Sequence, residues 1–349
     1  MGVNIKSLSI NQYQQAGAML INESKNILIT FLAAWSVLNG SITLGSMLAI
    51  QFIIGQMNSP LDQMIGFFQS AQNAKLSLER LGEIHLKQDE EPDNENKIEA
   101  IEGDKSITIS GVSFQYEGPH SAFVLKDIDL IIPEGKITAI VGTSGSGKTT
   151  LIKLLLGFYE PVKGTITVGN NRFSNLSSHF WRQKCGVVMQ DGFLFSDTIA
   201  KNIALNDESV DKEKLLNAVK VANIKDFIES LPLGYNTRIG NEGTGLSQGQ
   251  KQRLLIARAV YKNPQYIFFD EATNALDATN EAQIMKNLDQ FFKGKTVIVV
   301  AHRLSTVKNA DLIIVLEKGK IIEMDKHNEL IKNKGVYYNL VKNQLELGN

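Results

Sequence analysis

The sequence predicts an α/β domain over residues 106–349, preceded by a helical segment over residues 1–88 and an acidic linker over residues 89–105. Three observations support this prediction. A glycine-rich loop lies between a β-branched run and a helical run, and an apolar strand further along the chain ends in two carboxylates. Charged residues are sparse between positions 26 and 60. A chain of 349 residues has room for two domains of ordinary size.

Composition excludes several classes of function. The net charge is −1, so the chain lacks the basic field that nucleic-acid binding needs, and we expect no nucleic-acid partner. Cys185 is the only cysteine, which excludes an internal disulfide and a cysteine-rich metal site. The five histidines are scattered, and the first residues do not resemble a cleavable signal peptide.

The glycine-rich loop reads G-x-x-x-x-G-K-[ST] over Gly142–Thr149. It follows a β-branched run at Lys136–Val141 and precedes a helical run at Thr150–Leu156, which is the context that this phosphate-binding motif needs. Glycines let successive backbone N–H groups converge on an anion at the start of a helix. Lys148 would reach the β- and γ-phosphates, and the Thr149 hydroxyl would bind Mg²⁺. The motif predicts a P-loop nucleotide hydrolase whose ATP-binding residues are Gly142, Thr143, Ser144, Gly145, Ser146, Gly147, Lys148, Thr149 and Thr150.

A second motif, Tyr266–Glu271, is an apolar strand that ends in two carboxylates. In hydrolases of this class, a buried strand delivers an aspartate to the Mg²⁺ shell, so Asp270 is the expected metal-side carboxylate. Glu271 could polarise the attacking water as a general base. Such a strand is weak evidence alone and strong evidence after a phosphate-binding loop.

A third motif, Leu246–Gln250, precedes a helical run at Lys251–Tyr261. Ser247 stands where a helix N-cap would, which is the structural interpretation. The functional interpretation is that this helix start holds a phosphate. The two interpretations are compatible.

The first 88 residues contain two apolar runs, Ile27–Leu38 and Met47–Met57. Neither reaches the roughly 20 apolar residues of a simple membrane span, but extension to Tyr13–Leu38 and Leu44–Phe68 makes both long enough. Polar side chains inside such a span usually face a bundle interior, and here they are Gln51, Gln56, Asn58 and Gln63. A pair of soluble core helices is the alternative. The pattern becomes amphipathic over Gln69–Leu86, and the following stretch, Asp89–Asn96, contains no apolar residue.

From residue 106 to the end, the order of motifs resembles the C-terminal part of an ABC exporter half-transporter. Gly142–Thr149 matches the Walker A loop, and Phe269–Glu271 matches Walker B with its catalytic glutamate. The family signature LSGGQ is matched by Leu246, Ser247, Gln248, Gly249 and Gln250. The remaining matches are Asp277 in the D-loop, Gln190 at the Q-loop, His302 at the switch histidine and Tyr116 at the aromatic residue that stacks on adenine.

This resemblance implies an ABC ATPase domain with an antiparallel β subdomain and a helical subdomain. It also implies that residues 1–88 are a partial transmembrane domain, equivalent to the last two of six membrane helices. Two such ATPase domains, in a homodimer or a heterodimer, would enclose each ATP between Walker A and the partner's signature. Thr149, Gln190 and Asp270 would then serve Mg²⁺, Glu271 and His302 would act on the attacking water, and the partner's signature would contact the γ-phosphate.

The resemblance further implies ATP hydrolysis coupled to export across the cell membrane, with the ATPase domain on the cytoplasmic side. Residues 58–60 and 77–85 are similar to exporters that carry a leader peptidase and secrete bacteriocin-like peptides, which implies a peptide or small-molecule substrate. Two positions depart from the family pattern. Gln248 replaces a glycine of the signature, and Asn241 replaces a glutamate of the loop before it.

Other functions fit part of the pattern. A multidrug or lipid exporter would share the same motifs. A soluble ABC ATPase that works on nucleic acid or ribosomes would be expected to carry a second ATPase domain, a coiled coil or basic tracts, and none is evident in the sequence. A domain that binds nucleotide without turnover is disfavoured by Glu271 and His302.

Overall fold

The computed structural model describes residues 2–85, 91, 97–116, 118, 121–205, 209–240, 245–272, 278–301 and 307–347. The chain divides into two compact units, Met1–Asp89 and Glu90–Asn349.

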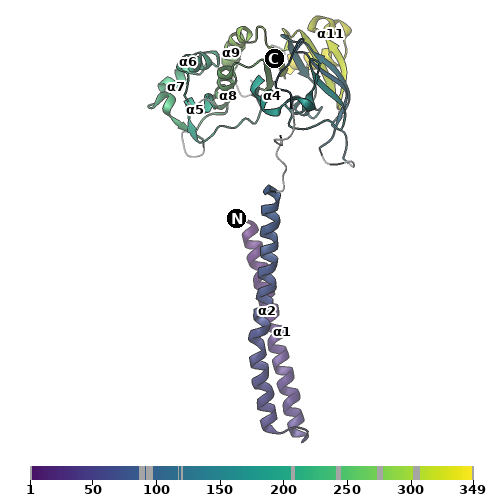
Figure 1. The fold of residues 1–349 in the computed structure, drawn as a ribbon, viewed down its shortest axis with the longest axis vertical. Helices are drawn as coiled ribbons and strands as arrows, with labels where there is room; N and C mark the ends of the chain where they lie inside the picture. Colours follow the sequence, from purple (N-terminus) through teal and green to yellow (C-terminus); the bar gives the residue numbers. More distant parts are fainter. Residues whose placement is uncertain are drawn as a thin grey trace. The chain divides into compact units, whose positions relative to one another are not determined.

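The first unit is a hairpin of two long helices, α1 (Gly2–Leu38) and α2 (Leu44–His85), which lie side by side (Figure 1). Gly40 turns the chain with a φ of 73°, and the Thr43 hydroxyl accepts a 3.2 Å hydrogen bond from the Ser46 backbone N–H at the start of α2. Between the helices, the Lys25 ammonium donates a 3.0 Å hydrogen bond to the Asn58 side-chain oxygen. The apolar runs and their flanks are therefore helical, as predicted.

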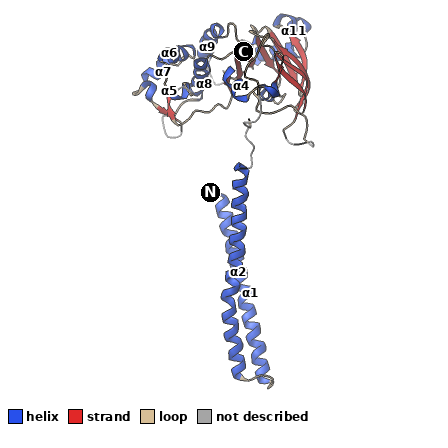
Figure 2. Ribbon diagram, in the orientation of Figure 1, coloured by secondary structure: helices blue, strands red, loops and turns tan. Residues whose placement is uncertain are grey.

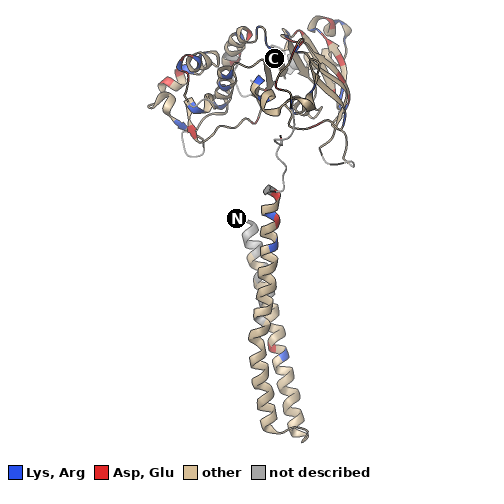
Figure 3. Cartoon of the chain, viewed as in Figure 1, with Lys and Arg blue, Asp and Glu red and all other residues tan. Residues whose placement is uncertain are grey.

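Apolar side chains of this unit are mostly exposed. Ala33 is the only buried residue among its described side chains, while Leu20 and Phe52 are about 70% exposed, at 70% and 69%. Charged side chains are few along both helices until the C-terminal part of α2 (Figure 3). Within the described ranges, no helix holds a stretch both long and apolar enough to cross a membrane.

The second unit is built on a six-stranded sheet in the order β12-β11-β3-β10-β9-β6. All neighbouring pairs are parallel except β11 with β12. The strands are β3 (Ile137–Val141), β6 (Cys185–Val188), β9 (Tyr266–Asp270), β10 (Thr296–Val300), β11 (Leu312–Glu317) and β12 (Lys320–Asp325). The strands expected around the glycine loop and before the two carboxylates, β3 and β9, are present and lie in this sheet.

A second sheet is antiparallel and has the order β2-β1-β4-β5. Its strands are β1 (Ile107–Phe114), β2 (Leu125–Ile132), β4 (Lys163–Val168) and β5 (Asn171–Arg172). A short antiparallel pair joins β7 (Asp197–Thr198) to β8 (Arg238–Ile239). The antiparallel β part of the predicted fold class is confirmed.

Figure 2 shows a group of helices, α5 to α9, beside the strands of this unit. The helices of this group are α5 (Ile199–Ile203), α6 (Lys212–Val221), α7 (Lys225–Ser230), α8 (Gln248–Lys262) and α9 (Ala278–Phe291), with a short 3₁₀ turn η2 (Gly234–Asn236). The others are α3 (Lys148–Leu155), η1 (Phe173–Asn175), α4 (Ser178–Lys184), α11 (His327–Asn333) and α12 (Val336–Leu347). The helical part of the predicted fold class is therefore present as well.

Both faces of the five parallel strands of this sheet are largely buried, as expected for parallel strands covered by other elements. Alternate residues of β9 show this arrangement. Tyr266 and Phe268 join the core shared with α3 and the antiparallel sheet, whereas Ile267 and Phe269 join the core shared with α6, α8 and α9. The sheet therefore lies between two hydrophobic cores. Because the strands are packed on both faces, the loops at their C-terminal ends are held in place.

Part of the expected linker packs on the second unit. The Glu91 carboxylate accepts hydrogen bonds from the Ser177 hydroxyl and from the Ser178 backbone N–H at the start of α4. Ile98 pairs with Leu176 in an isolated parallel bridge. Residues 92–96, between them, lie outside the described ranges.

Candidate nucleotide-binding site

The glycine loop connects the C-terminal end of β3 to the first turn of α3, as predicted. Gly142 and Gly147 have φ angles of 153° and 107°, where residues with a side chain are strained. A Cβ atom on Gly142 would overlap the Leu316 carbonyl oxygen, and one on Gly147 would lie 2.8 Å from Leu125 Cδ2. Only glycine fits these two positions, and it allows the loop backbone to turn tightly at the start of α3, where a phosphate would bind.

Lys148, the first residue of α3, is buried, and its ammonium donates 3.0 Å hydrogen bonds to the carbonyl oxygens of Gly142 and Thr143. Burial lowers the pKa of Lys148, and the nearby charges of Glu271 and Asp270 act in the opposite direction. The Lys148 ammonium thus lies against the backbone of the glycine loop. It is also near enough to Asp270 and Glu271 for their charges to affect its pKa.

Asp270 ends β9 and is only 1% exposed. Neither carboxylate oxygen accepts a hydrogen bond from any described residue. Burial raises the pKa of Asp270. The nearby Thr149 hydroxyl acts in the opposite direction by favouring the charged carboxylate, although the two groups do not meet the geometry of a hydrogen bond. A buried carboxylate without a partner is costly unless something pairs with it. Carboxylate, hydroxyl and amide oxygens are the ligands that Mg²⁺ prefers, so this site fits that ion.

Glu271 has a φ of 52°, a left-handed conformation that costs of order 1–3 kcal/mol for a residue other than glycine. Its backbone is held on both sides. The N–H donates a 3.2 Å hydrogen bond to the Val300 carbonyl oxygen, and the carbonyl oxygen accepts a 3.0 Å hydrogen bond from the Gln252 side chain of α8. The strand β9 therefore ends at Asp270, and the chain changes direction at Glu271.

Tyr116 lies beside the loop. Its hydroxyl shares a 2.9 Å hydrogen bond with the Thr150 hydroxyl in the first turn of α3. Its ring makes edge contacts with Phe114 and Tyr159, at centroid distances of 5.0 and 5.3 Å, yet 45% of the residue is exposed. A partly exposed aromatic ring next to a phosphate loop fits the predicted contact with adenine.

Gln190 follows β6, whose parallel register places Val188 opposite Phe269 of β9. Parallel neighbours end at the same edge of a sheet, so Gln190 and Asp270 come to that edge from adjacent strands. Gln190 is exposed. Its side-chain amide is therefore available at the edge where the metal ligands are predicted.

The signature residues open α8. Ser247 is the N-cap, and its hydroxyl accepts a 3.2 Å hydrogen bond from the Gln250 backbone N–H. The Gln250 side chain accepts a 2.9 Å hydrogen bond from the Ser247 N–H, which completes a capping box. The structural interpretation of Ser247 is therefore confirmed. Ser247 and Gln248 are exposed at a helix start, so they are free to meet a phosphate.

Three predicted positions lie outside the described residues, namely Asn241, Asp277 and His302. Sequence reasoning also missed three polar residues that hold the site together: Asn202, Gln252 and Arg258. Arg258 gave a weak signal, because it is the one charged residue in the apolar stretch Leu254–Tyr261, whereas Gln252 lies among other polar residues and gave none.

Comparison with known proteins decides the family of this domain. The sequence model of the ABC transporter family matches residues 125–274, which contain Walker A, the signature and Walker B. Residues 125–274 therefore match an ABC transporter ATP-binding domain. The predicted fold class is confirmed, because this α/β domain with its helical part is the ABC ATPase fold, and such domains bind ATP.

Relatives of the chain include the exotoxin translocation ATP-binding protein PaxB of Pasteurella aerogenes, which is 41% identical over 95% of this chain and 46% of its own length. The RTX-I toxin translocation ATP-binding protein of Actinobacillus pleuropneumoniae is 40% identical over 95% of this chain and 47% of its own length. A solved bacterial Atm1-family ABC exporter with ATP bound matches 95% of this chain and 59% of its own, with a TM-score of 0.72 and 32% identity. The chain thus spans about half the length of the curated relatives that it matches.

Proposed function

We propose that this chain is the ATP-hydrolysing subunit of an ABC exporter in the cell membrane, with the ATP-binding domain on the cytoplasmic side. The hydrolytic part of the proposal rests on the buried Asp270 carboxylate, which accepts no hydrogen bond from the described residues and acts electrostatically on the Lys148 ammonium. The export part is supported by relatives whose names describe toxin translocation and by the likeness to an ATP-bound exporter.

In this proposal, Tyr116 stacks on adenine, while Lys148 and the loop N–H groups hold the phosphates. Bound Mg²⁺ would neutralise phosphate charge, with Thr149, Gln190 and Asp270 as its protein-side partners. Glu271 accepts a proton from the attacking water, and His302 contacts the γ-phosphate. Ser247 and Gly249 contact the γ-phosphate bound to a second copy of the domain, in a homodimer or a heterodimer.

The bilayer and the export substrate are further partners in the proposal. We infer that the first unit is a partial transmembrane domain. The reason is that relatives named as translocation proteins match 95% of this chain, so the match extends into this unit. The same relatives favour a polypeptide substrate, ranging from a bacteriocin-like peptide to a protein toxin.

The proposal is tested by phosphate release from Mg·ATP by the full chain purified in detergent. We expect turnover in the natural sequence and its loss in Lys148→Ala, because the phosphates lose their only side-chain cation from the loop. Lys163→Ala, which removes an exposed lysine of β4, is the matched control and should hydrolyse ATP normally. Equal turnover in the two variants would contradict the assigned site.

The substrate class is tested by adding candidates to the hydrolysis assay. Stimulation by an unfolded polypeptide, and not by a hydrophobic drug or added lipid, is the result that the proposal expects. The reverse pattern would favour a multidrug or lipid exporter.

A further inference from the structure

The turn that carries Gln190 lies directly on α8. The Gly192 N–H donates a 3.2 Å hydrogen bond to the Met189 carbonyl oxygen, which closes the turn around Gln190. A Cβ atom on Gly192 would overlap the Leu255 side chain of α8. Glycine therefore lets the backbone of this segment approach the helix without space for a side chain between them.

Arg258 joins the same segment to α8 a turn further along the helix. Its guanidinium donates to the Phe193 carbonyl oxygen at 2.9 Å, to the Asn202 carbonyl oxygen at 2.8 Å and to the Asn202 side-chain oxygen at 3.3 Å. Burial lowers the pKa of Arg258 to about 10, so it stays charged at neutral pH. One rigid, planar group thus ties both ends of the segment to the helix.

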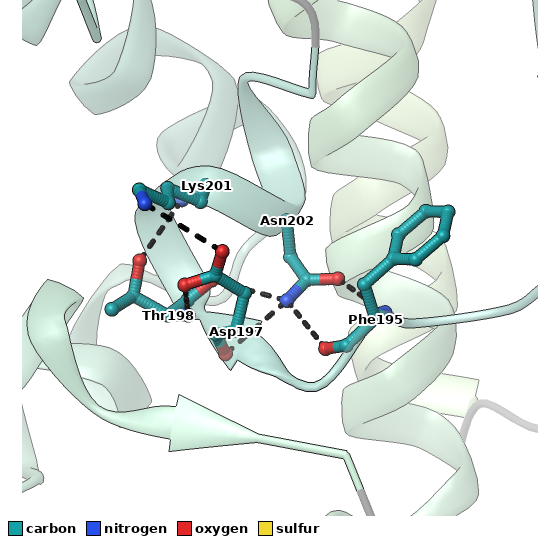
Figure 4. A network of polar contacts seen from close by, with 5 residues as sticks. All are labelled: Phe195, Asp197, Thr198, Lys201 and Asn202. Carbon is teal, nitrogen blue, oxygen red and sulfur yellow. Dashed lines mark hydrogen bonds and ion pairs between the residues drawn. The ribbon is translucent and has the colours of Figure 1, made fainter.

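Asn202 completes this contact from α5 (Figure 4). It is 1% exposed, and its side-chain amide donates to the carbonyl oxygens of Phe195 at 2.9 Å and Thr198 at 3.1 Å. Its side-chain oxygen accepts a 2.8 Å hydrogen bond from the Phe195 N–H. The loop between Gln190 and α5 is therefore closed by one buried amide, which Arg258 contacts in turn.

The helix that receives these contacts serves two other parts of the site. Its N-cap is Ser247, the signature residue, and its Gln252 side chain holds the carbonyl oxygen of Glu271. A single helix therefore touches the signature, the predicted general base and the segment after Gln190.

We propose that Arg258 and Asn202 are positioning residues that fix the Gln190 turn to α8, so that Gln190 and Ser247 move as one body. The inference rests on the proposed ATP hydrolysis, because it assigns Gln190 to the site of its own chain and Ser247 to the site of a second copy. Closure of α8 on the second copy's ATP then sets the position of Gln190 in its own site.

The test uses the full chain in detergent with Arg258→Lys, which keeps the charge and removes the planar fork of donors, and with Asn202→Ala. We expect kcat to fall about ten- to hundredfold, the cost typical of a misplaced catalytic group. The KM for ATP should stay within about twofold, because Tyr116 and Lys148 are untouched. Lys201→Ala is the matched control on α5, since it removes only a 3.7 Å surface ion pair with Asp197.

A second readout is independent of turnover. The Phe195 amide should exchange its hydrogen faster in both variants than in the natural chain, while amides of β9 and β10 should not. A purely structural role would instead lower ATP affinity and the unfolding temperature together and leave kcat unchanged in the folded fraction. That result, or normal kcat with normal Phe195 exchange, would overturn the proposal.

Failure to fold also decides the question. Should Asn202→Ala not fold, Arg258→Lys provides the test, and loss of folding in both variants would show a structural role only. Absence of turnover in the natural chain would contradict the proposed function, whereas the exchange measurement would still test the contact itself.

Discussion

At the scale of single residues, Glu271 is the group on which hydrolysis should depend most sharply. Glu271→Gln removes the base and keeps the shape of the side chain, the left-handed backbone contacts and the metal-side Asp270. We expect ATP binding to persist and turnover to fall by about 10²–10⁴, the usual range for loss of general-base assistance. Nucleotide binding and phosphate release, measured on the same sample, check this. Near-normal turnover would move the base role elsewhere, with His302 as the next candidate.

The sequence alone was enough to predict the residues of the site that bind phosphate and metal. Gly142, Lys148 and Asp270 are required by phosphate and metal chemistry, so a pattern of letters is enough to find them. Asn202 and Arg258 could not be found in this way, because their contacts join positions 56 residues apart and exist only after α5 and α8 pack together. Glu91 was likewise hidden, since its hydrogen bonds to Ser177 and Ser178 are far from it in the sequence.

At the scale of elements, the junction of β3 with α3 depends on a glycine that no other residue can replace. Gly142→Ala would force a Cβ atom into the Leu316 carbonyl oxygen, and the loop must move to relieve the overlap. We expect ATP affinity to fall at least tenfold, since even 1.4 kcal/mol of lost binding energy has that effect. Equilibrium binding of a fluorescent ATP analogue measures it.

The control for this change lies at the opposite end of β3. Gly135 also has a positive φ, 66°, but a Cβ atom there meets nothing within 4 Å. Gly135→Ala should cost of order 1–3 kcal/mol in the free energy of unfolding from backbone strain and leave ATP affinity unchanged. An equal loss of affinity in both variants would show that strain, and not the close approach at Gly142, disturbs the loop.

Elements were predicted well where their pattern is long or strongly bounded. The runs that became β3 and β9 are continuous β-branched or apolar stretches, so their positions were predicted closely. The helices α4, α5 and α7 have 7, 5 and 6 residues, too few for a helical period to show. Their existence depends on tertiary packing, which the sequence alone does not display.

At the scale of the whole molecule, the first unit should decide where the chain resides. Its exposed apolar side chains need a cover, and its Gln51 and Gln56 amides would need partner groups in hydrocarbon, as Asn58 has in Lys25 and Gln63 in Ser59. We expect the full chain to sediment with membranes and to be released by detergent but not by high salt. Recovery of the chain in the supernatant without detergent would contradict a membrane role for α1 and α2.

The central claim is that ATP is hydrolysed in a site shared by two copies of the domain, each of which supplies one half. The most direct measurement mixes a Lys148→Ala chain with a Ser247→Ala chain, after pairing of the two has been verified by differently tagged copies. Each variant alone is expected to be inactive, because one lacks the phosphate-binding lysine and the other the signature contact in both sites of its dimer. The mixture should regain turnover, since a mixed dimer contains one site with both residues intact. A mixture as inactive as either variant alone, despite verified pairing, would contradict the shared site.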